Sequence, residues 1–335
     1  MDQRDSAQPT QTTRWGILGT GWIASLFATD LALLPDARLV AVGSRTQARA
    51  DEFSIEFGGV RGYPTYAELV ADPEVDAVYV ASPHPSHHED VLLAIEAGKA
   101  VLCEKPFTLS AAQARELVDA ARARGTFLME AMWTRFLPHM VRVRELLAAG
   151  ALGEVRSVYA DHGQWFERNR EHRLFAPELG GGALLDLGVY PISLASMVLG
   201  TPSRVTAVSD PAFTGVDGQT SILLQHNGGA HAVLTCSLEA ASPVTAAIVG
   251  TEARIEIDRT WYAPTTFRLV TRDGVVTEYA EPCGPRGMQH EAAEVTRCLR
   301  AGLLESPLMP LDETVAIMAT MDEVRAQIGL TYPGE

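Results

Sequence analysis

The residues with the clearest potential for chemistry form a glycine-rich turn, Gly19-Thr20-Gly21-Trp22-Ile23-Ala24, directly after the apolar run Trp15 to Leu18. The spacing matches the G-x-G-x-x-A variant of the dinucleotide-binding fingerprint. Gly19 would make the tight turn, Gly21 would let a diphosphate approach the N–H groups that open a helix, and Ala24 would let that helix pack closely on its strand. An ordinary strand-to-helix turn can carry the same pattern, so the motif alone is weak.

The next predicted strand, Arg38 to Ser44, indicates which dinucleotide would bind. A site for NAD usually carries Asp or Glu roughly 20 residues beyond the glycines, where it accepts a bond from the ribose 2′-hydroxyl. Here the strand ends in Gly43-Ser44-Arg45, with no acid. The Arg45 guanidinium could meet a 2′-phosphate, and Ser44 could donate its hydroxyl. The pattern favours NADP over NAD, unless Arg45 is merely a solvated loop residue.

Two further segments follow predicted strands. Ser82-Pro83-His84 and His87 come after the strand Ala77 to Ala81, at the strand end where such sheets bind ligands. A metal site at these histidines is a weaker alternative, because no Cys or obvious distant ligand joins them. Glu104-Lys105-Pro106 follows the strand Ala100 to Cys103 and would place a cation at the same sheet edge. The plainer alternative for Lys105 is an ion pair with Glu104.

A fourth candidate is the glycine hinge Gly180-Gly181-Gly182, which opens a predicted helix. That helix carries Asp186 and Tyr190 four residues apart, a spacing that puts both side chains on one face.

The elements that must position these residues change character near residue 132. Strands and helices alternate over 14–132, which predicts a Rossmann-type, doubly wound parallel sheet. Over 133–335 the strands are short and often alternate apolar with polar residues, which predicts an α+β domain with a large, mostly antiparallel sheet. Its two C-terminal helices are free to pack back on the first domain. Residues 1–13 are polar and read as a flexible tail.

Composition narrows the classes of partner. The chain has 335 residues and a formal net charge of -15, a field that repels nucleic acid and anionic lipid. The longest apolar stretch, Gly182 to Leu199, is interrupted by Asp186, Gly188 and Pro191, so we expect no membrane span. The four cysteines show no paired spacing, so we expect neither a metal site nor disulfides. This cysteine usage fits a reducing compartment, and we expect a cytoplasmic location.

The ordered set of motifs resembles the glucose–fructose oxidoreductase / inositol dehydrogenase (Gfo/Idh/MocA) family over nearly the whole chain. The set comprises the fingerprint, Cys103-Glu104-Lys105-Pro106, and the run Gly182 to Tyr190. Met129 to Phe136 and Glu305 to Thr314 look like the branch that contains dimeric dihydrodiol dehydrogenase and the NADP-dependent D-xylose 1-dehydrogenases. That branch uses NADP, in agreement with Arg45.

The resemblance implies that Lys105 and Tyr190 form the catalytic pair, with Asp186 on the same helix face. The position of Tyr190 is His in the inositol dehydrogenase branch, so that branch's substrates should not be carried over. Trp133, Arg156 and Trp165 match positions that line the substrate pocket in the dihydrodiol branch.

We therefore expect hydride transfer between a nicotinamide and a carbinol carbon of a sugar, polyol or trans-dihydrodiol, with Tyr190 exchanging the hydroxyl proton. A neighbouring Lys105 ammonium would favour the phenolate. The alternatives are a cofactor-binding regulatory protein without turnover and an enzyme that uses bound NAD(P) for elimination on a glycoside.

A homodimer is also expected. Ile222, Leu224 and Val233 would form an apolar outer face of the second sheet that needs cover by a second copy, provided that the strand registers turn these residues outward.

Overall fold

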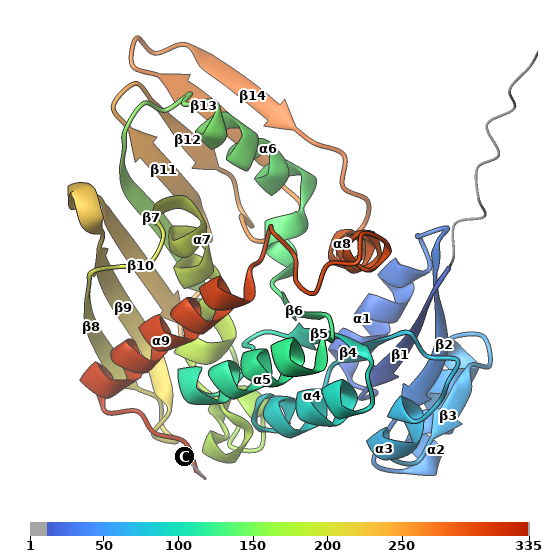
Figure 1. The fold of residues 1–335 in the computed structure, drawn as a ribbon. Coiled ribbons are helices and arrows are strands. Elements are labelled where there is room, and N and C mark those ends of the chain that lie inside the picture. Colours follow the sequence, from blue (N-terminus) through green and yellow to red (C-terminus); the bar gives the residue numbers. More distant parts are fainter. Residues whose placement is uncertain (1–11, 334–335) are drawn as a thin grey trace, which may run out of the picture.

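The computed structural model describes residues 12–333 as two sheets, each with its own covering helices (Figure 1). One sheet has six strands and is wholly parallel, and the other has eight strands and is mostly antiparallel. This arrangement confirms the predicted fold class, a Rossmann-type sheet followed by an α+β domain.

The first sheet has the strand order β3-β2-β1-β4-β5-β6. Its direction of winding reverses between β1 and β4, and ligands of such sheets bind at the carboxyl ends of the strands beside that reversal. The strands are fully apolar around this point because helices cover both faces. The strands are β1 (Thr13–Leu18), β2 (Ala37–Gly43), β3 (Arg61–Tyr63), β4 (Ala77–Val80), β5 (Ala100–Glu104) and β6 (Leu128–Ala131), and the helices are α1 (Trp22–Leu31), α2 (Gln47–Glu56), α3 (Tyr66–Val70), α4 (His87–Glu96) and α5 (Ala111–Arg124).

The second sheet has the order β14-β13-β12-β11-β7-β10-β9-β8, and only β7 and β10 run parallel. Its strands are β7 (Val155–Gly163), β8 (Arg204–Pro211), β9 (Asp217–Gln225), β10 (His231–Ser237), β11 (Ala246–Gly250), β12 (Ala253–Ile257), β13 (Thr266–Thr271) and β14 (Val276–Ala280). The helices are α6 (Pro138–Ala148), the π-helical turn η5 (Leu184–Gly188), α7 (Val189–Leu199), α8 (Gln289–Arg300) and α9 (Leu311–Ile328).

The two C-terminal helices join the domains. Helix α9 packs along β8 of the second sheet and against α5 of the first domain, and α8 packs against α1 (Figure 1). Both helices therefore lie back on the first domain, so the two domains are held together by helix packing as well as by the chain that connects them.

The apolar stretch around η5 and α7 belongs to the core. The segment Pro177–Leu199 is long and apolar enough to cross a membrane by composition, and 83% of its apolar window is buried inside the protein. Leu184, Leu185 and Val189 are fully buried there. The core accounts for this hydropathy.

The outer face of the second sheet differs in detail from the prediction. Ile222 and Leu224 are only 3% and 1% exposed, since they point toward the helices, whereas Leu223 between them is 45% exposed. Val233 is exposed as expected, and it pairs with Leu223 across β9 and β10. The register of β9 is thus shifted by one residue from the expected one, which exchanges the faces of its side chains.

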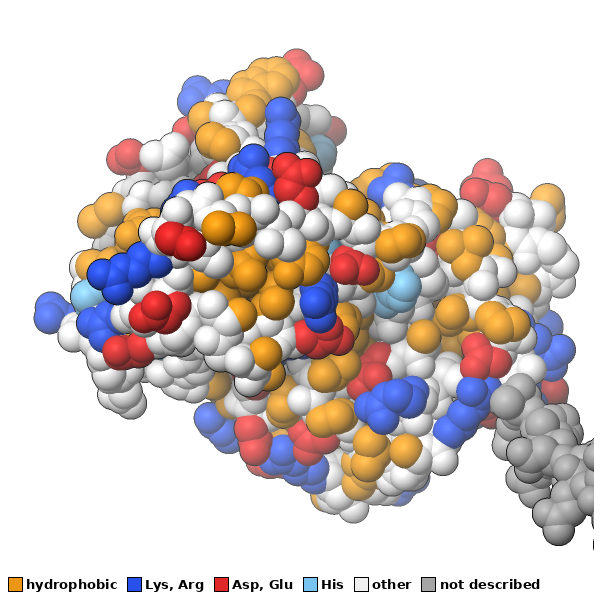
Figure 2. Space-filling model, turned by 90° about the horizontal axis from the view of Figure 1, so that it is seen from above, with side chains coloured by type: hydrophobic (Ala, Val, Ile, Leu, Met, Phe, Trp, Pro, Cys, Tyr) orange, Lys and Arg blue, Asp and Glu red, His pale blue; other side chains and the backbone are white. Residues whose placement is uncertain are grey.

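Acidic and basic side chains are interspersed on the face seen in Figure 2, with no broad area of either sign. Given the net charge of -15, an anionic ligand depends on individually placed cations and backbone dipoles.

Candidate active site

The glycine turn between β1 and α1 has the shape that a diphosphate needs. Gly19 has φ of 111°, and a Cβ there would lie 2.7 Å from the Ala81 carbonyl oxygen, so only glycine fits. At Gly21 a Cβ would meet no atom within 4 Å, which means that the space beside the turn is open. Gly21 supplies no side-chain cap to α1. The N–H groups at the start of α1 are therefore available to an anion, and the turn fits a dinucleotide.

The end of β2 lies beside this turn. Ser44 is 5% exposed, and its Oγ lies 3.4 Å from Thr20 Oγ1. Arg45 is exposed and forms no ion pair with a carboxylate in residues 12–333. The Arg45 guanidinium is thus free to meet an anion next to the fingerprint.

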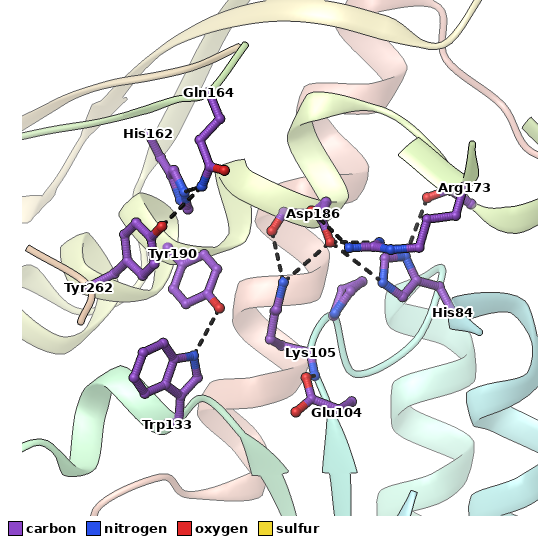
Figure 3. Close-up of polar contacts among 12 residues, drawn as sticks. His84, Glu104, Lys105, Trp133, His162, Gln164, Arg173, Asp186, Tyr190 and Tyr262 are labelled. Carbon is purple, nitrogen blue, oxygen red and sulfur yellow. Dashed lines mark hydrogen bonds and ion pairs between the residues drawn. The ribbon is translucent and has the colours of Figure 1, made fainter. Parts of the chain in front are cut away.

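Lys105 and Asp186 meet across the two domains (Figure 3). Lys105 follows β5, and its Nζ donates to the Asp186 carbonyl oxygen at 3.0 Å and lies 3.3 Å from Asp186 Oδ1. The alternative that Lys105 pairs with Glu104 is wrong for the side chain, because Glu104 Oε2 accepts from the Lys105 backbone N–H at 3.1 Å instead. The second carboxylate oxygen, Oε1, accepts from the Tyr79 hydroxyl.

Asp186 contacts two cations, Lys105 and Arg173, and lies near a histidine. Arg173 donates to Asp186 Oδ1 at 2.9 Å and Oδ2 at 3.4 Å, and His84 Nε2 lies 3.9 Å from Oδ1. Burial alone would raise the pKa of Asp186, but Lys105 and Arg173 outweigh it and hold that pKa well below its usual range. Burial opposes the charge on Lys105 too, yet Asp186 and Tyr190 leave its pKa above the usual value. Burial lowers the pKa of His84 to about 3, so His84 is neutral.

A local departure from the α-helix exposes the Asp186 carbonyl. Asp186 lies in the π-helical turn η5, where bonds run from residue i to i+5. The residue five positions on is Pro191, which has no N–H to donate, and Lys105 Nζ bonds to this carbonyl. The turn is fixed at its start by Asp217, whose Oδ2 accepts from the Leu184 N–H at 2.8 Å. The glycine hinge, the π-turn and Asp217 together aim Asp186 and Tyr190 at Lys105.

Tyr190 lies with its ring centroid 4.8 Å from Lys105 Nζ, and its hydroxyl oxygen accepts from Trp133 Nε1 at 2.9 Å. Burial raises the pKa of Tyr190 to about 12, although Lys105 and the Trp133 bond act in the opposite direction. The sequence analysis considered only the Lys105 ammonium, which favours the phenolate, but burial has the larger effect on the pKa of Tyr190. Tyr190 therefore keeps its proton at neutral pH, and since Trp133 occupies the acceptor side of the oxygen, that proton faces other partners.

An aromatic and polar wall surrounds Tyr190 on its other side. The His162 ring stacks on the Tyr262 ring with centroids 4.1 Å apart. The Tyr190 ring centroid lies 5.2 Å from that of His162 and 5.0 Å from that of Tyr262. Gln164 Nε2 lies 3.0 Å from the Tyr262 hydroxyl and 2.8 Å from His162 Nε2 (Figure 3). Because the amide donates to Nε2, His162 carries its proton on Nδ1. Burial lowers the pKa of His162 to about 3, so this wall is uncharged.

The loop after β4 is tied to the Lys105 turn. His87 is fully buried, with Nδ1 2.9 Å from the Pro106 carbonyl and Nε2 2.9 Å from the Ser82 carbonyl. Pro83 precedes the short helical turn His84–Ser86, and His84 Nδ1 lies 3.3 Å from the Gly180 carbonyl. These contacts hold the expected cofactor loop against both Lys105 and the glycine hinge.

Two residues expected to line the substrate pocket are not brought to this cluster. Arg156 is exposed, pairs with Glu154 at 2.6 Å, and stands six residues before His162 on the extended strand β7, which places it about 20 Å away. The structure therefore does not bring Arg156 to this cluster, and its place in the substrate pocket stays a prediction. Trp165 is 66% exposed and makes no ring contact with Trp133, Tyr190 or Tyr262 within the described residues.

Sequence reasoning missed Arg173, His162, Gln164 and Tyr262. Of these, His162 and Gln164 follow a predicted strand, Gly153 to Asp161, and polar residues at a strand end were the one available signal. Arg173 and Tyr262 come from irregular segments whose approach to Asp186 and Tyr190 depends on the tertiary fold.

Comparison with known proteins agrees with this geometry. Residues 13–132 match the oxidoreductase family model with an NAD-binding Rossmann fold, and residues 140–256 match the GFO/IDH/MocA C-terminal domain. A trans-1,2-dihydrobenzene-1,2-diol dehydrogenase from Mus musculus is 42% identical over 96% of this chain and 98% of its own length. The D-xylose 1-dehydrogenase (NADP(+)) of Hypocrea jecorina is 39% identical over 96% of this chain and 93% of its own.

Among solved structures, a 3-ketoreductase from Actinomadura kijaniata in complex with NADP and TDP-benzene superimposes with a TM-score of 0.83. It is 30% identical to this chain, and the match covers 95% of this chain and 98% of that one.

Proposed function

The chain belongs to the GFO/IDH/MocA family of NAD(P)-binding oxidoreductases, and we propose that it is an NADP-dependent dehydrogenase acting on a cyclic carbinol, either C1 of an aldose such as D-xylose or a trans-dihydrodiol. The observation that carries the proposal is the meeting of Lys105, Asp186 and Tyr190 between the two domains, beside a glycine turn that fits a diphosphate.

The cofactor would be held by the N–H groups after Gly21, by Ser44 and Arg45 at its 2′-phosphate, and by the loop after β4 near its nicotinamide. When bound, NADP supplies a carbon that accepts or gives a hydride. Relatives that use NADP and the unpaired Arg45 both support NADP over NAD.

Tyr190 exchanges the proton of the substrate hydroxyl. Its oxygen already accepts from Trp133 Nε1, so its own O–H is left to donate to a substrate oxygen in the reducing direction. Lys105 stabilises the phenolate that results, and Asp186 holds the Lys105 ammonium in place. Trp133, Tyr262 and His162 give the flat, uncharged surface on which a sugar ring or a diol ring can pack.

A substrate panel tests the activity. We expect absorbance at 340 nm to rise when the protein and NADP meet a D-aldopentose or a trans-dihydrodiol, and to rise much less with inositols. A protein that binds NADP yet reduces none of it with pentoses, hexoses, inositols or dihydrodiols would instead be a cofactor-binding regulator. Release of an aglycone from a glycoside without net absorbance change would identify elimination chemistry.

Tyr190→Phe and Lys105→Met should separate binding from chemistry. Neither group is needed to hold the diphosphate, so we expect NADP affinity within about threefold of wild type and turnover lower by roughly 10²–10⁴. Because the pKa of Tyr190 is about 12, only a small phenolate fraction accepts protons at neutral pH. The wild-type kcat/KM for oxidation should therefore rise by about tenfold per pH unit from pH 7 to 9.

In Tyr190→Phe that rise should be lost. Near-normal turnover in this variant would remove the tyrosine from the mechanism and leave Lys105 as the proton carrier.

Arg45→Ala should change cofactor choice. Removing the cation leaves the 2′-phosphate unpaired and hardly touches NAD, so we expect the KM for NADP to rise by about tenfold to a hundredfold. Arg38→Ala is the matched control, since Arg38 is an exposed arginine at the opposite end of β2. Equal losses for NADP and NAD would exclude Arg45 as the selector.

The protein is proposed to form a homodimer through the outer face of its second sheet. Val208, Leu223, Val233 and Tyr159 are 42% to 68% exposed, and Leu223, Val233 and Tyr159 form one cross-strand row over β9, β10 and β7. Helices α7 and α9 lie on the other face. An apolar row of this kind in the middle of a sheet favours burial against a second copy about a two-fold axis.

Light scattering after size-exclusion chromatography should give about twice the chain mass of 36.1 kDa at micromolar concentration. A charge placed in the row, Val233→Glu, should shift the mass toward one chain. Ile55→Glu is the control, because Ile55 is 80% exposed on α2 in the other domain and should leave the mass unchanged. A wild-type mass near that of one chain would refute this interface.

A further inference from the structure

The segment between β14 and α8 returns from the second domain to the first and ends beside α1 (Figure 1). It is fixed there by Asp30 of α1, which is 1% exposed and whose Oδ2 accepts from the Gly287 N–H at 3.0 Å and the Met288 N–H at 2.9 Å. Gly287 has φ of 105°, and a Cβ at this position would collide with Leu137. The backbone on either side of this point therefore has little freedom to move.

Arg286 directly precedes this anchor and extends over the start of the fingerprint helix. Its guanidinium carbon lies 5.7 Å from the centroid of the Trp22 ring. Trp22 is the first residue of α1, it follows Gly21, and it is 70% exposed. A cation over an exposed indole is held by a modest attraction only, so the pair can accept a further partner.

Arg286 has no carboxylate partner. Within residues 12–333 it forms no ion pair, although the chain carries 42 Asp and Glu against 27 Lys and Arg. Arg286 differs from the other exposed arginines without an ion pair in its place, over the first residue of α1, where its guanidinium can bind an anion that the helix N-terminus also attracts.

A diphosphate at the fingerprint turn would be stabilised by a cation from another part of the chain. The fingerprint from Gly19 to Ala24 contains no Lys or Arg. Lys105 is engaged with Asp186, and Arg45 follows β2, where the adenosine ribose is expected. The N-terminus of α1 contributes only about half an elementary charge. A cation over Trp22 would supply the missing countercharge.

We propose that Arg286 binds the cofactor diphosphate, so that the second domain supplies the cation and the first domain supplies the N–H groups. Asp30 is the positioning residue that fixes the segment to the same helix. This inference rests on the proposed NADP function and extends it. Since NADP and NAD share the diphosphate, Arg286 contributes affinity for both and selects neither, in contrast to Arg45.

Equilibrium titration of NADPH and NADH with Arg286→Ala tests the assignment without relying on turnover. We expect the Kd of both to rise by the same factor, about tenfold to a hundredfold, because a charged hydrogen bond common to both is lost. Arg286→Lys should retain part of the affinity. Arg272→Ala is the matched control, an exposed arginine of the same domain at the β13–β14 turn, and should leave both Kd values unchanged.

A cofactor fragment sharpens the test. 2′-AMP has the 2′-phosphate but no diphosphate, so it should bind Arg286→Ala as tightly as wild type and bind Arg45→Ala more weakly. Unchanged Kd values for NADPH and NADH in Arg286→Ala would overturn the inference, and a loss confined to NADPH and 2′-AMP would place Arg286 at the 2′-phosphate instead. Failure of the wild type to bind either dinucleotide would refute the proposed function itself.

Discussion

The contact on which the site depends is the bond between Lys105 of the first domain and Asp186 of the second. Lys105 and Asp186 have side chains only 12% and 7% exposed, so each charge would be costly if it were alone. Removing one partner of a buried pair typically costs about 3–5 kcal/mol, because the other charge is left without compensation. The pair therefore fixes more than a side-chain rotamer. It sets how the strand end that carries Lys105 faces the helix that carries Tyr190.

This arrangement also decides how Tyr190 titrates. Burial raises the pKa of Tyr190, and the neighbouring Lys105 ammonium lowers it. The Asp186 carboxylate offsets part of the effect of Lys105, so the effect of burial is the larger. Arg173 adds a second cation to Asp186 without contacting Tyr190. The carboxylate thus pairs with the buried Lys105 and the more exposed Arg173, and it offsets the effect of the Lys105 charge on the pKa of the phenol. Tyr190 therefore keeps its proton at neutral pH, as the proposed reduction of a carbonyl requires.

The parts of the site that lie in short motifs could be predicted from the sequence, because local spacing determines their geometry. The turn at Gly19 and Gly21, the strand-end Lys105, and the shared face of Asp186 and Tyr190 all follow from rules of that kind. Arg173 and Tyr262 could not be predicted, since irregular segments carry them and only tertiary packing brings them near. Arg156 shows the converse, because the resemblance suggested a place in the substrate pocket, whereas its position on β7 lies about 20 Å from His162. In β9, a shift of one residue exchanged Leu223 for Ile222 and Leu224 on the outer face.

The two domains are joined by charged contacts at both ends of the expected cofactor site. At one end Lys105 meets Asp186, and at the other Asp30 of α1 accepts the N–H groups that precede α8. In each case a carboxylate of one domain accepts from donors of the other. The carboxylate belongs to the second domain in the Lys105–Asp186 contact and to the first domain in the contacts of Asp30. Because Asp30 lies in the helix that begins directly after the fingerprint turn, a shift of α8 would also displace the N-terminus of α1. The expected nucleotide site and the Lys105–Asp186 contact therefore depend on the same domain arrangement, and each includes a buried carboxylate that receives donors from the other domain.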